Sequence, residues 1–96
     1  MDNSKSWAGE GRLAFGQAYE TRVSLTLSRS DGQGTWSGEV LIHGAAAIHP
    51  GDRIELTVGR SPCQALVRQA SVRGGAGHRT TTLLVEGEGP PPPPLR

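Results

Sequence analysis

The sequence is poor in cysteine, in aromatic residues and in long apolar runs. Its single cysteine, Cys63, excludes an intrachain disulfide and fits a reducing compartment. No apolar run approaches the roughly 18 residues that span a membrane, and the N-terminus lacks the apolar segment of a secretion signal. Ninety-six residues leave no room for a second core, so we expect one soluble, cytoplasmic domain.

Helical periodicity is missing as well, since no segment keeps a helical pattern for three turns. Apolar and polar residues instead alternate, with the period of a half-buried strand, in six segments: 10–16, 19–28, 35–42, 53–58, 63–73 and 79–89. Glycine-rich turns separate these segments at roughly ten-residue spacing. The pattern predicts an all-β fold, either a small antiparallel six-stranded β-barrel or a compact β-sandwich.

The same alternation predicts which side chains face the interior. These are Leu13, Phe15, Tyr19, Val23, Leu25, Leu27, Trp36, Val40, Ile42, Ile54, Leu56, Val58, Cys63, Ala65, Val67, Leu83 and Val85. Gly38, in the middle of a strand, predicts a bulge or a close approach of the backbone. Beyond Val67 the parity of the apolar residues slips, since Ala70 and Val72 fit the other register; a bulge near Arg68 and Gln69 would bring these two side chains onto the inward face as well.

The ends of the chain lack the alternating pattern. We expect a flexible N-terminus over residues 1–9, one barrel domain over 10–89 and a disordered, proline-rich tail over 90–96. Consecutive prolines cannot donate the hydrogen bonds of a sheet, so the tail should leave the barrel as an extended polyproline segment. Pro91, Pro94 and Arg96 fit the P-x-x-P-x-R spacing of ligands for an aromatic-lined groove. A tail without any ligand role is the alternative.

Basic residues are concentrated in one part of the chain. Residues 53–79 carry five arginines and one acid, a local charge of +4, whereas residues 1–52 carry four bases and six acids. Arginine binds phosphate and carboxylate groups through two parallel hydrogen bonds, so arginines gathered on one side of a barrel would attract an anionic partner. The alternative is that they only fill solvated outward positions. The candidate binding residues are Arg53, Arg60, Arg68, Arg73 and Arg79.

Histidine and cysteine give only weak candidates for chemistry. Zinc sites take three or four ligands, usually with one closely spaced pair, and His43, His49, His78 and Cys63 contain no such pair. No nucleophile elbow accompanies Cys63, and its parity places it in the core. We therefore expect no enzymatic activity, no metal and no cofactor. The lack of aromatic residues between positions 37 and 96 argues against stacking on single-stranded nucleic acid.

Four segments of the chain, RVSLTL, SGEVLI, PGDRIELTV and ALVRQASV, resemble in order the strands of PilZ domains over residues 22–72. That family consists of six-stranded bacterial barrels that bind the second messenger cyclic di-GMP. The resemblance implies a barrel and places the family's ligand motif near TWSGE, with Ser37 at the serine position. Thr35 and Val40 stand where the motif has aspartate and glycine, so the motif is not intact.

Together these observations predict a non-catalytic binding or interaction module. Its expected partner is another protein or an anionic ligand, bound through the arginine-rich part, and not a membrane or a nucleic acid. A PilZ-like receptor for a cyclic dinucleotide or another phosphate ligand is the first alternative. The second alternative is a homodimeric scaffold that forms by edge-strand pairing.

Overall fold

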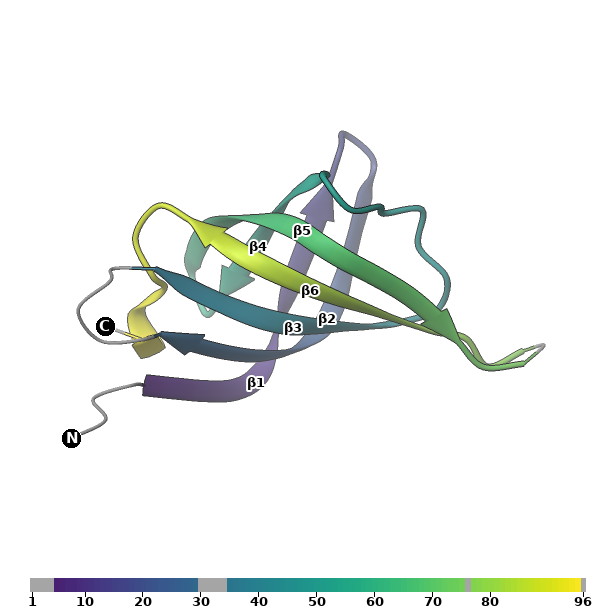
Figure 1. Cartoon of the computed structure of the whole chain (residues 1–96), viewed down its shortest axis with the longest axis horizontal. Coiled ribbons are helices and arrows are strands. Elements are labelled where there is room, and N and C mark those ends of the chain that lie inside the picture. The colour runs from purple at the N-terminus through teal and green to yellow at the C-terminus, as the bar shows by residue number, and fades with distance from the viewer. Residues whose placement is uncertain (1–4, 30–34, 76, 96) are drawn as a thin grey trace.

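A computed structural model describes residues 5–29, 35–75 and 77–95, which form a closed antiparallel barrel. Its elements are β1 (Lys5–Phe15), β2 (Tyr19–Arg29), β3 (Trp36–His43), β4 (Arg53–Val58), β5 (Ser61–Arg73), β6 (Thr80–Glu88) and one 3₁₀ turn, η1 (Pro93–Leu95) (Figure 1). The order around the barrel is β1-β2-β3-β6-β5-β4. The predicted six-stranded barrel is confirmed, and the alternative of a sandwich is wrong. Within the described ranges, no helix is long and apolar enough to cross a membrane.

Closure of the barrel depends on a short ladder between β1 and β4. β1 pairs with β2 along its whole length but with β4 only over residues 12–14. Gly11 lies beside this crossing, where any side chain would meet the carbonyl oxygen of Thr57. Glycine is therefore needed at the point where β1 bends against β4.

Alternate residues of each strand fill the interior, as the sequence predicts. The predicted core residues are buried except Phe15, Tyr19 and Ala70, which pack half-buried against the core, and Val72, whose inward prediction is wrong because it lies 51% exposed near the end of β5. Two buried side chains lie outside the predicted strands: Ile48 and Leu95. Ile48 belongs to the loop that connects β3 to β4. Thr81 holds this loop, because its hydroxyl donates to the carbonyl oxygen of Gly44 at 2.8 Å and accepts from the amide of Ala46 at 3.2 Å.

The predicted flexible N-terminus is wrong for residues 5–9. This segment is the first part of β1 and pairs with residues 25–29 of β2. Trp7 provides the physical reason, because its indole folds over Gly9 and packs against the core. Residues 1–4 lie outside the described part of the chain.

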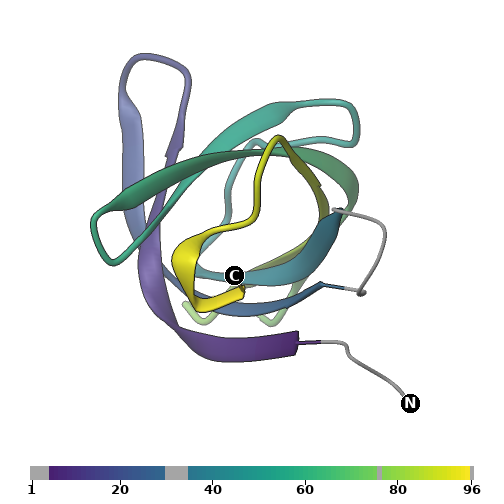
Figure 2. The same cartoon turned by 90° about the vertical axis from the view of Figure 1, so that its left-hand side faces the viewer.

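The described part of the tail is not the extended polyproline segment that the sequence predicts. Pro93–Leu95 forms the 3₁₀ turn η1, which lies against β1 and β2, and Leu95 is fully buried. Figure 2 looks into this end of the barrel and shows the tail crossing its opening. Burying a leucine gains about 2 kcal/mol, while prolines lose little conformational entropy when they are ordered. Arg96 lies outside the described residues.

Both predicted irregularities of the strands are found. Gly38 is a close approach, since a side chain there would lie 2.8 Å from the carbonyl oxygen of Thr26. The register of β5 against β6 shifts between Val67 and Gln69, which leaves Arg68 as the extra residue of a bulge.

The bulge divides the hairpin of β5 and β6 into two halves. In the inner half, residues 64–67 pair with residues 85–88; in the outer half, residues 69–73 pair with residues 80–84. We call the described residues of the outer half and its turn, 69–75 and 77–84, the arm. The arm projects beyond the barrel (Figure 1) and the molecule reaches 45 Å along its longest axis.

Candidate functional site

The five candidate arginines lie at different places on the barrel. Arg60 is in the turn between β4 and β5, at the opposite end of β4 from Arg53. Arg68 is at the β5 bulge. Arg73 ends β5, and Arg79 directly precedes β6, so these two arginines flank the turn of the arm. Of the five, the structure thus brings Arg73 and Arg79 together.

Two of the other arginines have their charge offset by carboxylates. The Nε atom of Arg53 lies 3.0 Å from a carboxylate oxygen of Glu88, and that of Arg68 lies 2.9 Å from one of Glu86. These side chains are exposed, and such surface pairs contribute about 0–1 kcal/mol to stability. Their larger effect is to reduce the positive potential of the inner half of the hairpin.

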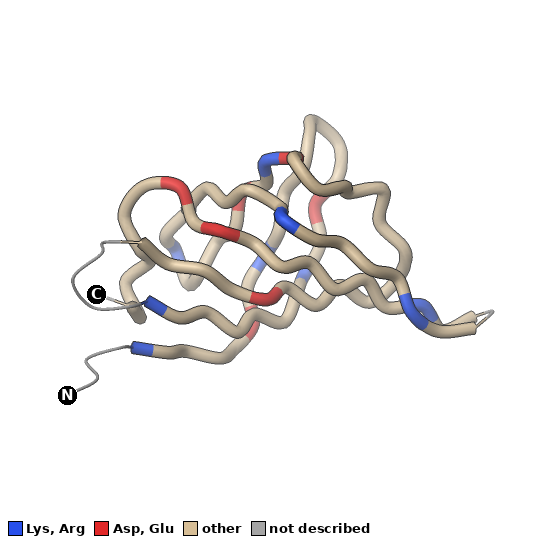
Figure 3. The backbone as a smooth tube through the Cα atoms, viewed as in Figure 1, with Lys and Arg blue, Asp and Glu red and all other residues tan. Residues whose placement is uncertain are grey.

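The arm carries positive charge and no acid. Residues 69–84 contain Arg73, Arg79 and His78 but neither Asp nor Glu. No ion pair joins Arg73 or Arg79 to any carboxylate in the part of the chain that the structure describes. Figure 3 shows basic positions, and no acidic ones, along the described arm. The arm therefore offers incoming anions two guanidinium groups without a carboxylate partner, and these line separate hollows: Arg73 one beside Gln69 and Thr82, and Arg79 one beside His43 and Thr80.

A tight turn holds these two arginines near each other. Gly74 has a φ of 109°, and a side chain there would collide with the carbonyl oxygen of His78. The amide of His78 donates to the carbonyl oxygen of Gly75 at 3.2 Å. On the β3 side, the amide of Gly44 donates to the carbonyl oxygen of Arg79 at 2.7 Å. Only glycine accommodates both the positive φ and the close approach at position 74.

A shallow hollow of about 430 Å³ adjoins Arg73. It is lined by Pro50, Gln69, Ala70, Ser71, Arg73, Thr82 and Leu84. Leu84 is 40% exposed and Val72, next to Arg73, is 51% exposed. The arm thus combines positive charge with exposed apolar surface, a combination that is common in protein-binding surfaces.

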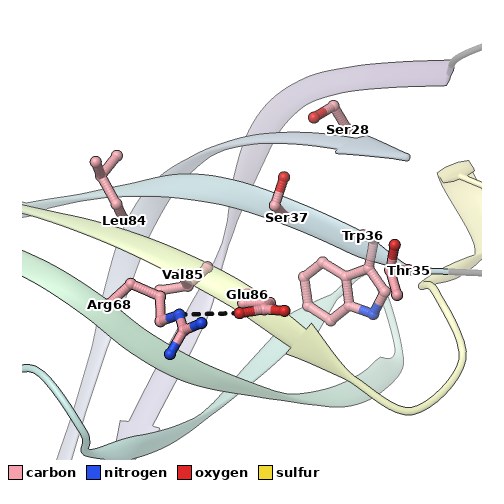
Figure 4. Close-up of a pocket in the computed structure, with 8 residues that line it drawn as sticks. All are labelled: Ser28, Thr35, Trp36, Ser37, Arg68, Leu84, Val85 and Glu86. Atoms are coloured by element: carbon pink, nitrogen blue, oxygen red, sulfur yellow. Dashed lines mark ion pairs between the residues drawn. The ribbon is translucent and has the colours of Figure 1, made fainter. Parts of the chain in front are cut away.

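A second hollow, of about 370 Å³, lies over the inner half of the hairpin and its neighbours (Figure 4). Ser28, Ser37 and Glu86 are cross-strand neighbours on β2, β3 and β6, and with Arg68 they form a polar row across four strands. In Figure 4 the dashed line marks the ion pair of Arg68 with Glu86. Thr35 and Leu84 complete the rim of this hollow. Leu84 therefore borders both hollows.

Trp36 anchors the floor of this region from inside the barrel. It is only 2% exposed, and its indole lies so close to Gly87 that no side chain would fit at position 87. Its Nε1 atom has no hydrogen-bond partner among the described residues, and in Figure 4 it points away from Glu86. The indole is therefore a core side chain rather than a stacking surface for a ligand.

The structure gives Cys63 the features of a core side chain. Burial, with a smaller contribution from the charge of Glu55, raises the pKa of its thiol to about 11. The Sγ atom lies 3.3 Å from the carbonyl oxygen of Leu56, to which the thiol donates. A protonated, buried thiol is neither a nucleophile nor a metal ligand at neutral pH. Among the described residues, no group of three His, Cys, Asp or Glu is placed to hold a metal ion.

The proposed peptide-ligand residues of the tail are not held in one extended polyproline helix. Pro94 lies within the 3₁₀ turn, whereas Pro91 precedes it. Arg96, the third of these residues, lies outside the described residues. Because Leu95 is buried in the barrel, a groove-binding partner would have to displace it from the core.

Sequence reasoning did not identify the exposed apolar residues of the arm or the polar row of the second hollow. Leu84 could have been found, because it alternates with Leu83 and Val85, which the pattern assigns to the interior. The row of Ser28, Ser37 and Glu86 could not, since it depends on the pairing of β3 with β6, which is distant from it in the sequence.

Comparison of the chain with models of known protein families, with curated proteins and with solved structures found no match. The resemblance to PilZ domains accordingly stays a prediction. A function for this barrel has to be argued from the contacts, charges and exposed surfaces of its own residues.

Proposed function

We propose that the protein is a non-catalytic binding module that takes an anionic partner on the arm. One observation carries this proposal: of the five clustered arginines, Arg73 and Arg79 lie together and face no carboxylate in the described structure. Two uncompensated guanidinium groups at a projecting turn attract anions over a distance of about 8 Å at physiological salt. Exposed Val72 and Leu84 add apolar contact area beside the charge.

The test compares retention on an immobilised sulfated polyanion, heparin, for two double variants with the same change of net charge. Arg73→Glu with Arg79→Glu is expected to elute at clearly lower salt than the unchanged protein. Arg53→Glu with Arg60→Glu is the matched control and should elute much closer to the unchanged protein. Equal losses in both double variants would show that only net charge matters and would contradict the proposal.

A PilZ-like receptor is the second candidate, and the hollow around Arg68 favours it. Ser37 and Thr35, which stand at two positions of the resembled ligand motif, both line this hollow together with Arg68. Cyclic di-GMP would then raise the melting temperature by mass action. Ser37→Ala with Arg68→Ala would abolish that increase, whereas the arm double variant would keep it. An unchanged melting temperature at millimolar cyclic di-GMP would dismiss this candidate.

A further inference from the structure

The outer half of β5 has a backbone edge that no other strand covers. β4 pairs with β5 only over residues 61–66. One step further, Val67 donates to the carbonyl oxygen of Asp52 and accepts from the amide of Gly51, both at 2.8 Å. From residue 69 to residue 73, no backbone group of the described chain bonds to β5 on this side. Uncovered edges are templates for pairing with another extended chain.

The direction of the backbone groups on this edge follows from hydrogen bonds on either side of it. In an antiparallel sheet, successive residues direct their N–H and C=O groups to alternate edges. The carbonyl oxygen of Arg79 accepts from the amide of Gly44 on the β3 side. The N–H and C=O groups of the next residue, Thr80, therefore point to β5 and bond with those of its partner Arg73. Because Ser71 lies two residues before Arg73, its N–H and C=O groups also point to β6. Ala70 and Val72 direct their N–H and C=O groups to the open edge.

The side chains along this edge select the chemistry of a partner. Gln69, Ser71 and Arg73 line the outer hollow together with Pro50, which lies beside the edge. Val72 alternates with Ser71 and Arg73 along β5, so its side chain lies on the opposite face, where it is half exposed. A strand added here would therefore place one set of alternate side chains near Arg73 and the other set near Val72.

We propose that the open edge of the arm, from Ala70 to Arg73, binds an extended segment of a partner protein as an added strand, and that acidic and apolar residues alternate in this segment. The proposal rests on the proposed function and names its partner class. Acidic side chains would pair with Arg73, and apolar ones would cover Val72. The four backbone groups of Ala70 and Val72 would give the added strand its register.

Two other partners fit the edge less well. A second copy of the chain, added through the same edge, would bring the arginines of two arms onto one short ribbon, where like charges repel. A nucleic acid could meet the two guanidinium groups but would leave the backbone groups of the edge unpaired. It would also lack aromatic rings for stacking, since Trp36 is buried.

Amide hydrogen exchange of the full chain tests the geometry directly. In the unbound protein, the amides of Ala70 and Val72 should exchange faster than those of Ser71 and Arg73, which bond to β6. A segment bound on the edge should slow the exchange of Ala70 and Val72 selectively. If Val72 were as protected as Ser71 in the unbound protein, the edge would not be open and the inference would fail.

A capped peptide of alternating valine and glutamate is the binding probe, with a valine–lysine peptide as its charge control. Only the acidic peptide is expected to bind. Methylation of the backbone nitrogens of either all valines or all glutamates gives two further probes. One of these should bind and the other should not, because only alternate peptide N–H groups face the edge. Binding of both methylated peptides would contradict strand addition.

Substitutions at Val72 distinguish the contribution of its backbone N–H group to peptide binding from that of its side chain. Val72→Pro removes the N–H group that faces the open edge but leaves the ladder to β6 intact, and should weaken peptide binding about tenfold. Val72→Ala keeps that N–H group and should weaken binding much less. Equal losses in the two variants would overturn strand addition. If heparin retention still depended on Arg73 and Arg79, the proposed function would survive that result. If heparin retention did not depend on these arginines, both the proposed function and strand addition would be contradicted.

Discussion

The two halves of the β5–β6 hairpin share the same pair of strands but differ in almost every physical respect. In the inner half β4 covers the edge of β5, whereas β3 covers β6 in both halves, up to Glu86; the inner half also has the carboxylates Glu86 and Glu88, which offset Arg68 and Arg53. The arm has an uncovered edge on β5, no acid and exposed apolar side chains. The difference begins at the extra residue of the bulge, where β5 leaves β4.

The comparison shows how a barrel of this size can provide a binding surface without weakening its core. Six strands close a small interior, and closure leaves few residues for anything else. By extending one hairpin past the ladder with β4, the chain obtains exposed side chains, Val72 and Leu84 among them, on strands whose inward residues, such as Leu83, still belong to the core. Identical substitutions in the two halves should therefore have different effects on stability, and three matched pairs test this difference.

The largest effect is expected for the leucine that the tail places in the barrel end, against β1 and β2. Leu95→Ala removes a fully buried side chain, and should lower the free energy of unfolding by about 3 kcal/mol. Leu84→Ala, on the arm, makes the same change at a position that is 40% exposed, and should cost less than about 1 kcal/mol. Urea denaturation measures both. A stable Leu95→Ala protein would mean that the tail does not belong to the core.

A second pair concerns space rather than burial. Gly87→Ala adds a methyl group against the indole of Trp36 in the inner half, and should lower the free energy of unfolding by about 2 kcal/mol. Gly75→Ala adds the same group in the turn of the arm, where nothing lies within 4 Å and φ is not positive, so stability should hardly change. Thermal unfolding provides the comparison. Comparable losses at the two positions would show that the arm is packed as tightly as the inner half.

These pairs also mark how far sequence reasoning reaches. The alternation of apolar and polar residues is sufficient to predict where the strands run, and the slip of parity after Val67 is sufficient to predict the bulge. Both features depend only on the local order of side chains. Alternation even leaves Leu84 on the outside. Local patterns do not distinguish the inner half from the arm, however, because they place Val72 inward like Val67, although Val72 is half exposed.

What sequence reasoning missed depends on contacts between distant segments. Leu95 and Ile48 lie outside any alternating pattern, and are buried because the barrel ends need covering. Arg53 and Glu88 are 35 residues apart, so no local pattern indicates that they form an ion pair. The charge count therefore treated five arginines as equivalent, although among the described residues carboxylates pair with Arg53 and Arg68 and not with Arg60, Arg73 or Arg79, of which the last two flank one turn.

The third pair lies on a single strand, on the two sides of the bulge. Val67→Ala removes two methyl groups from a fully buried position and should lower the free energy of unfolding by about 2 kcal/mol. Val72→Ala, five residues later, should stay within about 0.5 kcal/mol of the unchanged protein. The contrast is measured by urea denaturation at equal protein concentration. If Val72→Ala were the more harmful change, the arm would be packed against something, such as a second copy of the chain.

The smallest effect is expected from alkaline pH. It comes from Cys63, which directly precedes the inner half on β5. The pKa of the Cys63 thiol is about 11 in the folded chain, against 9.0 for the unperturbed group, because burial and then the charge of Glu55 disfavour the thiolate. Below pH 9 both states keep the proton. Between pH 9 and 11 the unfolded chain releases it first, so this group should reduce stability as pH rises, by about 1 kcal/mol near pH 10. Cys63→Ala should remove that part of the alkaline decline, whereas Val72→Ala, on the arm, should retain it. If Cys63→Ala and the unchanged protein lost stability in parallel above pH 9, the thiol would not be held in the core, and the inner half would be less closed than its packing indicates.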